Sequence, residues 1–212
     1  NEYDFEKILE LGKRWEIPRL TFKSYPCGSI SHPYMDCALR IKQKYSPAAE
    51  QIAEVICRTA EGPVHRLWEP LADKQKPVSS YGAKFSLPYS IAVMLIRGQA
   101  GLEEFSEAAI RDTELLALAE KVRYELDPTI DYPRHFEGHV QVKMKDGAVF
   151  TEDQLHPRGG YEDPLPPEEI EAKFRANAQL ALDENRVEEV VKLVQRLERL
   201  PTISILTETL IP

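Results

Sequence analysis

Two segments of the chain carry side chains that could bind or protonate a small anion. In residues 21–33 these are Lys23 and His32, and in residues 83–90 the group that can move a proton is Tyr89. Each segment runs from an extended, turn-rich stretch into the expected start of a helix, where unpaired backbone N–H groups favour carboxylates and phosphates. The combination predicts an anion-binding surface with acid or base groups beside it, and it does not identify the anion.

Each of these side chains also has a purely structural interpretation, which stays open. A lysine at the end of a strand is usually a solvated charge, and a tyrosine in a buried helix usually packs with its hydroxyl on a backbone group. His32 directly precedes Pro33 and could simply cap the helix that begins there. Cys27 would need an activating base to act as a nucleophile, and His32 is the only candidate near it in the sequence.

The elements that must position these groups follow from periodicity and helix caps. Residues 15–22 alternate in hydrophobicity and are expected to form a strand that leads into the Lys23 loop. Ser86 is the expected N-cap of an apolar, buried helix that runs to Gly98. Residues 62–80 contain several prolines and are expected to form a long irregular connection that includes one helical turn.

The remaining elements indicate the fold class. Strands are expected at residues 51–60 and 122–126, and Asp146-Gly147 between two alternating runs predicts a hairpin. Strands and helices in this order are typical of an α+β fold. The predicted division is a lead-in helix (1–13), a two-layer α/β domain (14–165) and a C-terminal helical part (166–212).

The C-terminal part is predicted to contain two amphipathic helices at residues 168–182 and 187–200, followed by an apolar tail. Their apolar stripe consists of Phe174, Val187, Val190, Val191, Val194 and Leu197. Helices this short need another surface to bury such a stripe. We therefore expect a further surface, outside these helices, to cover the stripe.

Composition excludes several classes of function. The chain has 212 residues, of which 42% are hydrophobic and 29% charged, and its net charge of −8 argues against sequence-independent nucleic-acid binding. It has no apolar run long enough for a bilayer and no signal-peptide pattern. Three widely spaced cysteines fit a reducing compartment, so we expect a cytoplasmic protein. Metal-ligand spacing and nucleotide loops are missing, so we expect neither a metal nor a cofactor.

A series of motifs extends from about residue 11 to residue 200. They are Leu11-Gly12, Trp15-Glu16-Ile17, Phe22-Lys23-Ser24-Tyr25-Pro26-Cys27, His32 followed by Asp36, Phe85-Ser86-Leu87-Pro88-Tyr89-Ser90-Ile91-Ala92, Asp112 before Leu118-Ala119 and Lys121-Val122, Gly159-Gly160-Tyr161-Glu162-Asp163-Pro164-Leu165 and Lys173-Phe174. In this order they resemble the MmgE/PrpD family, which includes 2-methylcitrate dehydratase, cis-aconitate decarboxylase and iminodisuccinate epimerase. Each motif is weak alone, and the ordered combination is specific.

The resemblance implies that this sequence is the α/β lid domain and the returning C-terminal helices of a considerably longer protein. The implied activity is that of a lyase or isomerase acting on a small polycarboxylate, and we expect a 2-methylcitrate dehydratase-like reaction. The implied partners are the family's N-terminal helical domain, which is missing here, and a second copy in a homodimer. The alternative is a non-catalytic α+β module that docks a partner through its C-terminal helices.

The resemblance also implies residue roles. Lys23 matches a lysine that reaches the active site at the domain junction, Tyr89 matches a tyrosine of the same site, and His32 falls on a position that is often histidine. The implied catalytic roles are carboxylate binding or acid catalysis for Lys23, proton donation or orientation for Tyr89, and a supporting donor role for His32. Gly28 stands where some members carry Cys or His, which leaves the reaction undecided. We expect Lys23, His32 and Tyr89 to meet in one pocket.

Overall fold

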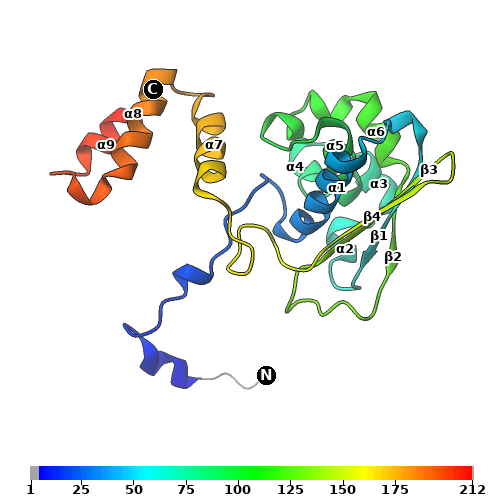
Figure 1. Cartoon of the computed structure of the whole chain (residues 1–212), viewed down its shortest axis with the longest axis horizontal. Coiled ribbons are helices and arrows are strands. Elements are labelled where there is room, and N and C mark those ends of the chain that lie inside the picture. The colour runs from blue at the N-terminus through cyan, green and yellow to red at the C-terminus, as the bar shows by residue number, and fades with distance from the viewer. Residues whose placement is uncertain (1–4, 212) are drawn as a thin grey trace. The chain divides into compact units, whose positions relative to one another are not determined.

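The computed structural model describes residues 5–211, and the chain divides into two units. The first unit ends at Pro164 and the second begins at Leu165. Figure 1 labels the helices and strands of both. The predicted lead-in helix falls partly on residues 1–4, which lie outside the described residues. The part that is described forms a 3₁₀-helix, η1 (Phe5–Glu10).

The first unit is built on a mixed sheet, and the predicted α+β fold class is confirmed. Its strands are β1 (Ile52–Thr59), β2 (Val122–Leu126), β3 (Gly138–Met144) and β4 (Val149–Gln154), in the order β2-β1-β3-β4. β1 pairs with β2 in parallel and with β3 antiparallel, and β3 and β4 form an antiparallel hairpin. The hairpin turn contains Asp146-Gly147 as predicted, with Gly147 at a φ of 92° that favours glycine.

Helices cover one face of this sheet (Figure 1). They are α1 (His32–Tyr45), α2 (Val64–Leu67), α3 (Leu71–Gln75), α4 (Ser80–Ala83), α5 (Leu87–Arg97) and α6 (Thr113–Ala119), with 3₁₀-helices η3 (Ser29–Ser31), η4 (Ala49–Gln51), η5 (Glu103–Phe105) and η6 (Ala109–Arg111) between them. α1 packs against β3, β4 and α5, and α5 also packs against α6. The connection over residues 62–80 is more helical than predicted, because it holds α2, α3 and the first residue of α4.

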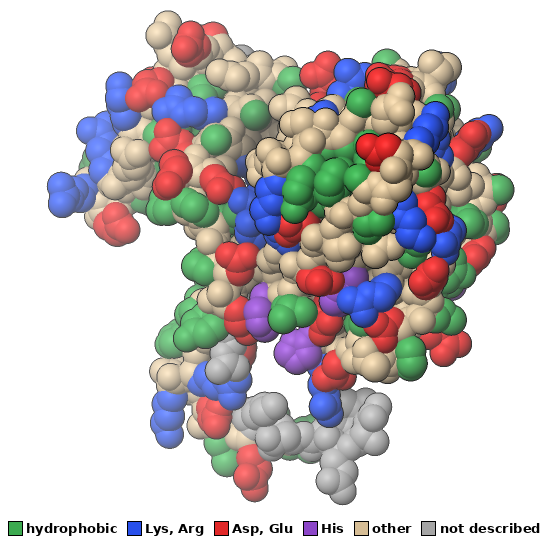
Figure 2. Space-filling view, turned by 45° about the vertical axis from the view of Figure 1, so that its right-hand side comes forward, with side chains coloured by type: hydrophobic (Ala, Val, Ile, Leu, Met, Phe, Trp, Pro, Cys, Tyr) green, Lys and Arg blue, Asp and Glu red, His purple; other side chains and the backbone are tan. Residues whose placement is uncertain are grey.

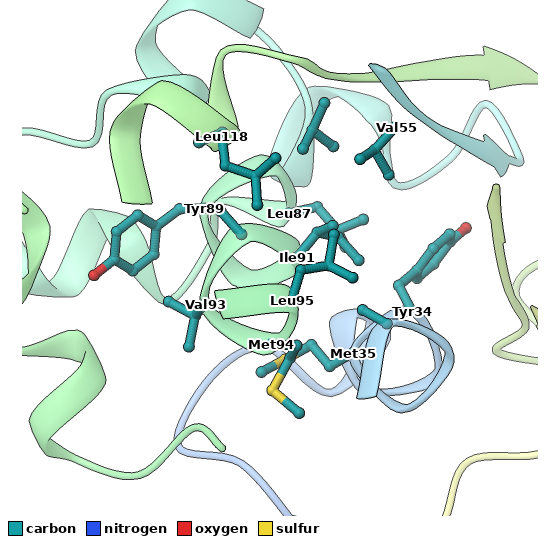
Figure 3. Close-up of a cluster of buried hydrophobic side chains, with 14 of the residues drawn as sticks. Tyr34, Met35, Val55, Leu87, Tyr89, Ile91, Val93, Met94, Leu95 and Leu118 are labelled. Carbon is teal, nitrogen blue, oxygen red and sulfur yellow. The ribbon is translucent and has the colours of Figure 1, made fainter. Parts of the chain in front are cut away.

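The α5 helix forms as its sequence predicts. The Ser86 hydroxyl accepts the backbone N–H of Tyr89 at 3.1 Å, and Gly98 ends the helix in the left-handed conformation at a φ of 70°. Residues 87–95 are all buried, and Figure 3 shows α5 side chains packed between those of α1, β1 and α6. Each large apolar side chain buried there contributes roughly 1.5–3 kcal/mol to the hydrophobic free energy of folding.

The strand predicted at residues 15–22 is wrong. Residues 17–19 form a 3₁₀-helix, η2 (Ile17–Arg19), and the residues on either side are not in a sheet. A segment with alternating hydrophobicity forms a strand only when a neighbouring strand is there to hydrogen-bond with it. Among the backbone hydrogen bonds of residues 5–211, only the one from Phe22 N–H to the Gly159 carbonyl, at 2.9 Å, joins this stretch to a distant residue. Pro18 also removes a backbone donor.

The second unit contains α7 (Pro167–Ala178), α8 (Glu184–Gln195), η7 (Leu197–Arg199) and α9 (Ser204–Thr209). The sequence pattern predicts only an apolar tail at residues 203–211. In the structure this stretch contains α9, which packs on α8. Val187, Val190 and Val191 of the apolar stripe are buried, and the expected packing of these helices on a further helical domain stays a prediction. Val194 and Leu197 remain exposed, at 53% and 41%.

Within residues 5–211, no helix combines the length and apolar character needed to cross a membrane. On the face drawn in Figure 2, lysine and arginine side chains are interspersed with acidic ones.

Candidate functional site

A pocket of about 300 Å³ lies where the two chemistry-bearing segments meet in the first unit. Its lining residues are Lys23, Gly28, Ser29, Ile30, Arg66, Leu67, Phe85 and Phe136. Two of these are cations, four are large apolar residues, and none is acidic. In a chain with a net charge of −8, such a lining favours a small anion that also carries hydrocarbon.

The walls of the pocket come from loops far apart in the sequence. Gly28 donates its backbone N–H to the Lys84 carbonyl at 3.0 Å, which fixes the first loop against the segment that begins α5. A Cβ atom on Gly28 would lie 3.6 Å from the Phe85 ring, an ordinary contact distance. The two segments thus lie together at this pocket, where the second contributes Phe85 to the lining and not the predicted Tyr89.

Lys23 is one of the residues that line this pocket. Its Nζ donates to the Cys27 carbonyl at 3.2 Å, so the ammonium is held by its own loop. Cys27 itself is buried, and burial raises the pKa of its thiol to about 12, although Lys23 and Lys84 oppose the shift. A thiol with this pKa is almost entirely protonated at neutral pH and is a poor nucleophile.

Arg66 is a pocket residue that sequence reasoning missed. It lies in α2, within the connection that was expected to be irregular, and its guanidinium forms no ion pair with the part of the chain that the structure describes. An arginine without an acidic partner at a pocket is a ready binding group for a carboxylate. Only the tertiary structure brings it near Lys23, since no local pattern distinguishes it from other surface arginines.

His32 is the first residue of α1 and is buried. Its ring meets the Tyr25 ring edge-on, with the centroids 5.2 Å apart and an interplanar angle of 70°. It does not line the pocket that contains Lys23. The structure thus places it beside Tyr25 of the Lys23 loop and outside the lining of the pocket.

Tyr89 does not line the pocket either. Its side chain is fully buried, its hydroxyl donates to the Glu104 carbonyl at 2.8 Å, and its ring packs against Phe105. In Figure 3 it points to the opposite side of α5 from Tyr34 and Met35. Burial, with the charges of Asp112 and Glu104, raises the pKa of the phenol well above its usual value. The first unit therefore does not bring Lys23 and Tyr89 together, and the catalytic role of Tyr89 stays a prediction.

A family model described as the MmgE/PrpD C-terminal domain matches residues 25–199. The chain belongs to the MmgE/PrpD family. The resemblance seen in the sequence motifs is confirmed, and His32, Arg66 and Tyr89 all lie inside the matched range. Lys23 lies just before it.

Curated relatives of this MmgE/PrpD chain include cis-aconitate decarboxylases from fungi and mammals. The Aspergillus terreus protein is 30% identical over 97% of this chain and 43% of its own length. The Homo sapiens protein is 35% identical over 90% of this chain and 40% of its own length, and the Mus musculus protein is 28% identical over 90% and 39%. This chain thus spans about two fifths of the length of the curated relatives it matches.

Groups of His, Cys, Asp and Glu that could hold a metal ion are not found among residues 5–211. The pocket of this MmgE/PrpD chain offers instead two cations and an apolar wall, which can bind carboxylates by charge and exclude water from the carbon skeleton.

Proposed function

We propose that this chain is the substrate-binding lid of a lyase that removes carbon dioxide from a small unsaturated tricarboxylate of the cis-aconitate type. The observation that carries the proposal is the pocket that contains Lys23 and Arg66 and no acidic residue. The relatives described above are named as cis-aconitate decarboxylases, which favours decarboxylation. The finer expectation of a 2-methylcitrate dehydratase-like reaction stays a prediction.

The two cations have different parts in this proposal. Lys23 pairs with one carboxylate as a compact point charge, and Arg66 holds another through the two parallel N–H groups of its planar guanidinium. A third carboxylate that faces Phe85 and Phe136 is poorly solvated. Poor solvation disfavours the charged carboxylate relative to neutral carbon dioxide.

The bond changes balance without an oxidant or reductant. The bond between the carbon skeleton and the leaving carboxylate breaks, and its electron pair stays on the skeleton, next to the double bond that delocalises it. A proton then adds to a carbon atom that shares this delocalised electron pair. The Lys23 ammonium stabilises the developing charge and is the proposed donor, with His32, whose ring contacts Tyr25, as a supporting group.

We further propose that the other catalytic groups come from a helical domain like the family's N-terminal one. Apolar side chains of the N-terminal stretch of the first unit are exposed and suit such a contact, namely Phe5, Ile8, Leu9, Leu11, Trp15, Ile17, Leu20 and Phe22. Exposed apolar groups in this density usually mark a protein interface. The expected homodimer stays a prediction beside this proposal.

Binding of cis-aconitate to the chain, measured by isothermal titration calorimetry, tests the first half of the proposal. We expect Lys23→Ala and Arg66→Ala each to weaken binding at least about tenfold, since each removes a charged hydrogen-bond partner. Lys145→Ala in the hairpin turn is the matched control, because it removes an equal charge away from the pocket. Equal affinities in all four proteins would remove the pocket from the proposal.

Turnover tests the second half. The chain can be fused behind the part of the Homo sapiens relative that it does not match, and carbon dioxide release from cis-aconitate can be compared with water loss from 2-methylcitrate. We expect carbon dioxide release that is lost in Lys23→Ala. Water loss from 2-methylcitrate alone would instead support the dehydratase-like reaction.

The second candidate function is the non-catalytic α+β module. The exposed Val194 and Leu197 of the second unit favour it, because they leave an apolar surface free for a partner. A folded fusion that turns over neither compound, together with a chain that does not bind cis-aconitate, would favour this module over the lid.

A further inference from the structure

A buried carboxylate lies beside the loop that carries Lys23. Asp36 belongs to α1, and its side chain is 3% exposed. The Tyr25 hydroxyl donates to Asp36 Oδ1 at 2.6 Å, and Arg158 Nε lies 3.4 Å from the same oxygen. Asp36 Oδ2 is buried and has no hydrogen-bond partner in the part of the chain that the structure describes.

Keeping a carboxylate there costs free energy, because a buried charge is stable only when it is paired and hydrogen-bonded. Burial raises the pKa of Asp36, and the Tyr25 hydroxyl and the charges of Arg158 and Arg40 only partly oppose this. A serine or alanine in this turn of α1 would avoid the cost. The contacts that Asp36 makes should therefore account for its burial.

Asp36 holds two loops at once. Through Tyr25 it contacts the loop over residues 23–28, and through Arg158 it contacts the loop over residues 156–163. Phe22, which directly precedes the first loop, donates its backbone N–H to the carbonyl of Gly159 in the second loop at 2.9 Å. The loop with Lys23 is thus fastened by residues that do not line the pocket.

We propose that Asp36 is a positioning residue for Lys23, acting through the hydroxyl of Tyr25. This inference rests on the proposed function of the Lys23 pocket. Tyr25 lies between Lys23 and Cys27, and the carbonyl of Cys27 accepts the Lys23 ammonium at 3.2 Å. A loop that lifts at Tyr25 therefore moves both the Cα atom of Lys23 and the carbonyl that orients its ammonium.

The free thiol of Cys27 gives a readout that does not depend on activity. Cys27 is buried in this loop, whereas Cys37 and Cys57 are buried elsewhere in α1 and β1 and serve as internal references. We expect Tyr25→Phe, which removes only the hydroxyl, to raise alkylation of Cys27 by about tenfold relative to Cys37 and Cys57, measured by peptide mass spectrometry. Tyr34→Phe is the matched control, because it removes another buried tyrosine hydrogen bond, to the Arg58 carbonyl at 3.0 Å.

A rescue series separates positioning from general stability. Asp36→Ala should raise Cys27 alkylation as Tyr25→Phe does, and Asp36→Asn should restore protection, because its amide oxygen can still accept the Tyr25 hydroxyl. Cys27 protection that is the same in Tyr25→Phe, Tyr34→Phe and the unchanged chain would overturn the inference. Equal rises at all three cysteines would overturn it too, since they indicate global unfolding.

Calorimetry with cis-aconitate then connects the loop to the pocket. We expect Tyr25→Phe to bind about fivefold more weakly and Tyr34→Phe to bind as the unchanged chain does. Normal binding by Tyr25→Phe despite an exposed Cys27 would refute the positioning of Lys23 while the proposed function stands. If the unchanged chain does not bind cis-aconitate, the proposed function fails and the inference fails with it, while the Cys27 result still decides whether Asp36 fastens the loop.

Discussion

The backbone N–H of Gly28 donates to the carbonyl of Lys84 at 3.0 Å, and this bond joins two of the segments that line the pocket. It connects a loop that precedes α1 with the turn that precedes α5, so residues far apart in sequence face one cavity. Gly28 has ordinary extended dihedrals, with a φ of −61°. The backbone conformation at this position does not require glycine. The missing side chain leaves open the space beside the Phe85 ring.

Filling that space should block the pocket without unfolding the protein. A Cβ atom on Gly28 meets the Phe85 ring at a normal contact distance of 3.6 Å, so Gly28→Ala should leave both the fold and cis-aconitate affinity nearly unchanged. Gly28→Leu should weaken binding by about tenfold or more, because its branched side chain occupies the pocket. Calorimetry and thermal unfolding of both variants check this. A Leu variant that binds normally would show that the ligand lies elsewhere.

The N-cap of α5 should contribute measurably to stability. The Ser86 hydroxyl accepts from Tyr89 N–H and donates to the Lys74 carbonyl, and it is buried. We expect Ser86→Ala to lower the free energy of unfolding by about 1–2 kcal/mol. Urea denaturation gives this value. The control is Ser79→Ala, because Ser79 caps the short helix α4 and its loss should lower the free energy of unfolding by less. An equal loss in both variants would argue against a special role for the α5 cap.

The two interpretations of Tyr89 predict different results for Tyr89→Phe. Since its hydroxyl is bound to the Glu104 carbonyl in the core, we expect a loss of about 1 kcal/mol in unfolding free energy and unchanged cis-aconitate affinity. The catalytic role drawn from the resemblance predicts that carbon dioxide release by the fusion protein falls as well. Measuring unfolding, binding and turnover on the same variant distinguishes the two.

The buried carboxylate should make stability depend on pH. Burial raises the pKa of Asp36, so the folded state binds the proton more tightly than the unfolded state does. The stability that this proton contributes is complete below the unfolded pKa of about 3.9 and is lost as pH rises through the raised folded pKa. Asp36→Asn carries no such proton.

The comparison to make is the difference in unfolding free energy between Asp36→Asn and the unchanged chain. We expect this difference to shift in favour of the Asn variant as pH rises from about 4 to about 7. Urea denaturation across this range measures it, and all other titrating groups are common to both proteins. A difference that stays constant, or moves the other way, would contradict the raised pKa.

Local signals in the sequence predict much of the fold. The cap at Ser86, the glycine at the end of α5 and the Asp-Gly hairpin each act through neighbouring residues, and all three are found where the sequence places them. The alternation of residues 15–22 misleads for the same reason, because a local pattern says nothing about whether a partner strand is present. α9 was missed because only its contact with α8 explains why a short apolar tail is helical.

The candidate site is less predictable than the fold. Lys23 and the meeting of the two segments follow from the motifs, but the pocket is completed by Arg66 and Phe136, which are distant in sequence and carry no pattern of their own. Tyr89 shows the opposite case. Its hydroxyl could donate a proton, and the sequence motif therefore points to it. In the structure η5 packs against its ring, and the hydroxyl donates to the Glu104 carbonyl away from the pocket lining.

The position of β1 in the sheet has a consequence for how the chain acquires its shape during synthesis. β1 leaves the ribosome before both of its neighbours, since Val55 pairs with Val122 on one side and with Val142 on the other. Until β3 has emerged, an apolar strand with open edges must stay apart from other nascent chains. We expect slow folding for a chain of this size, and we expect truncations that end before β3 to accumulate as aggregates.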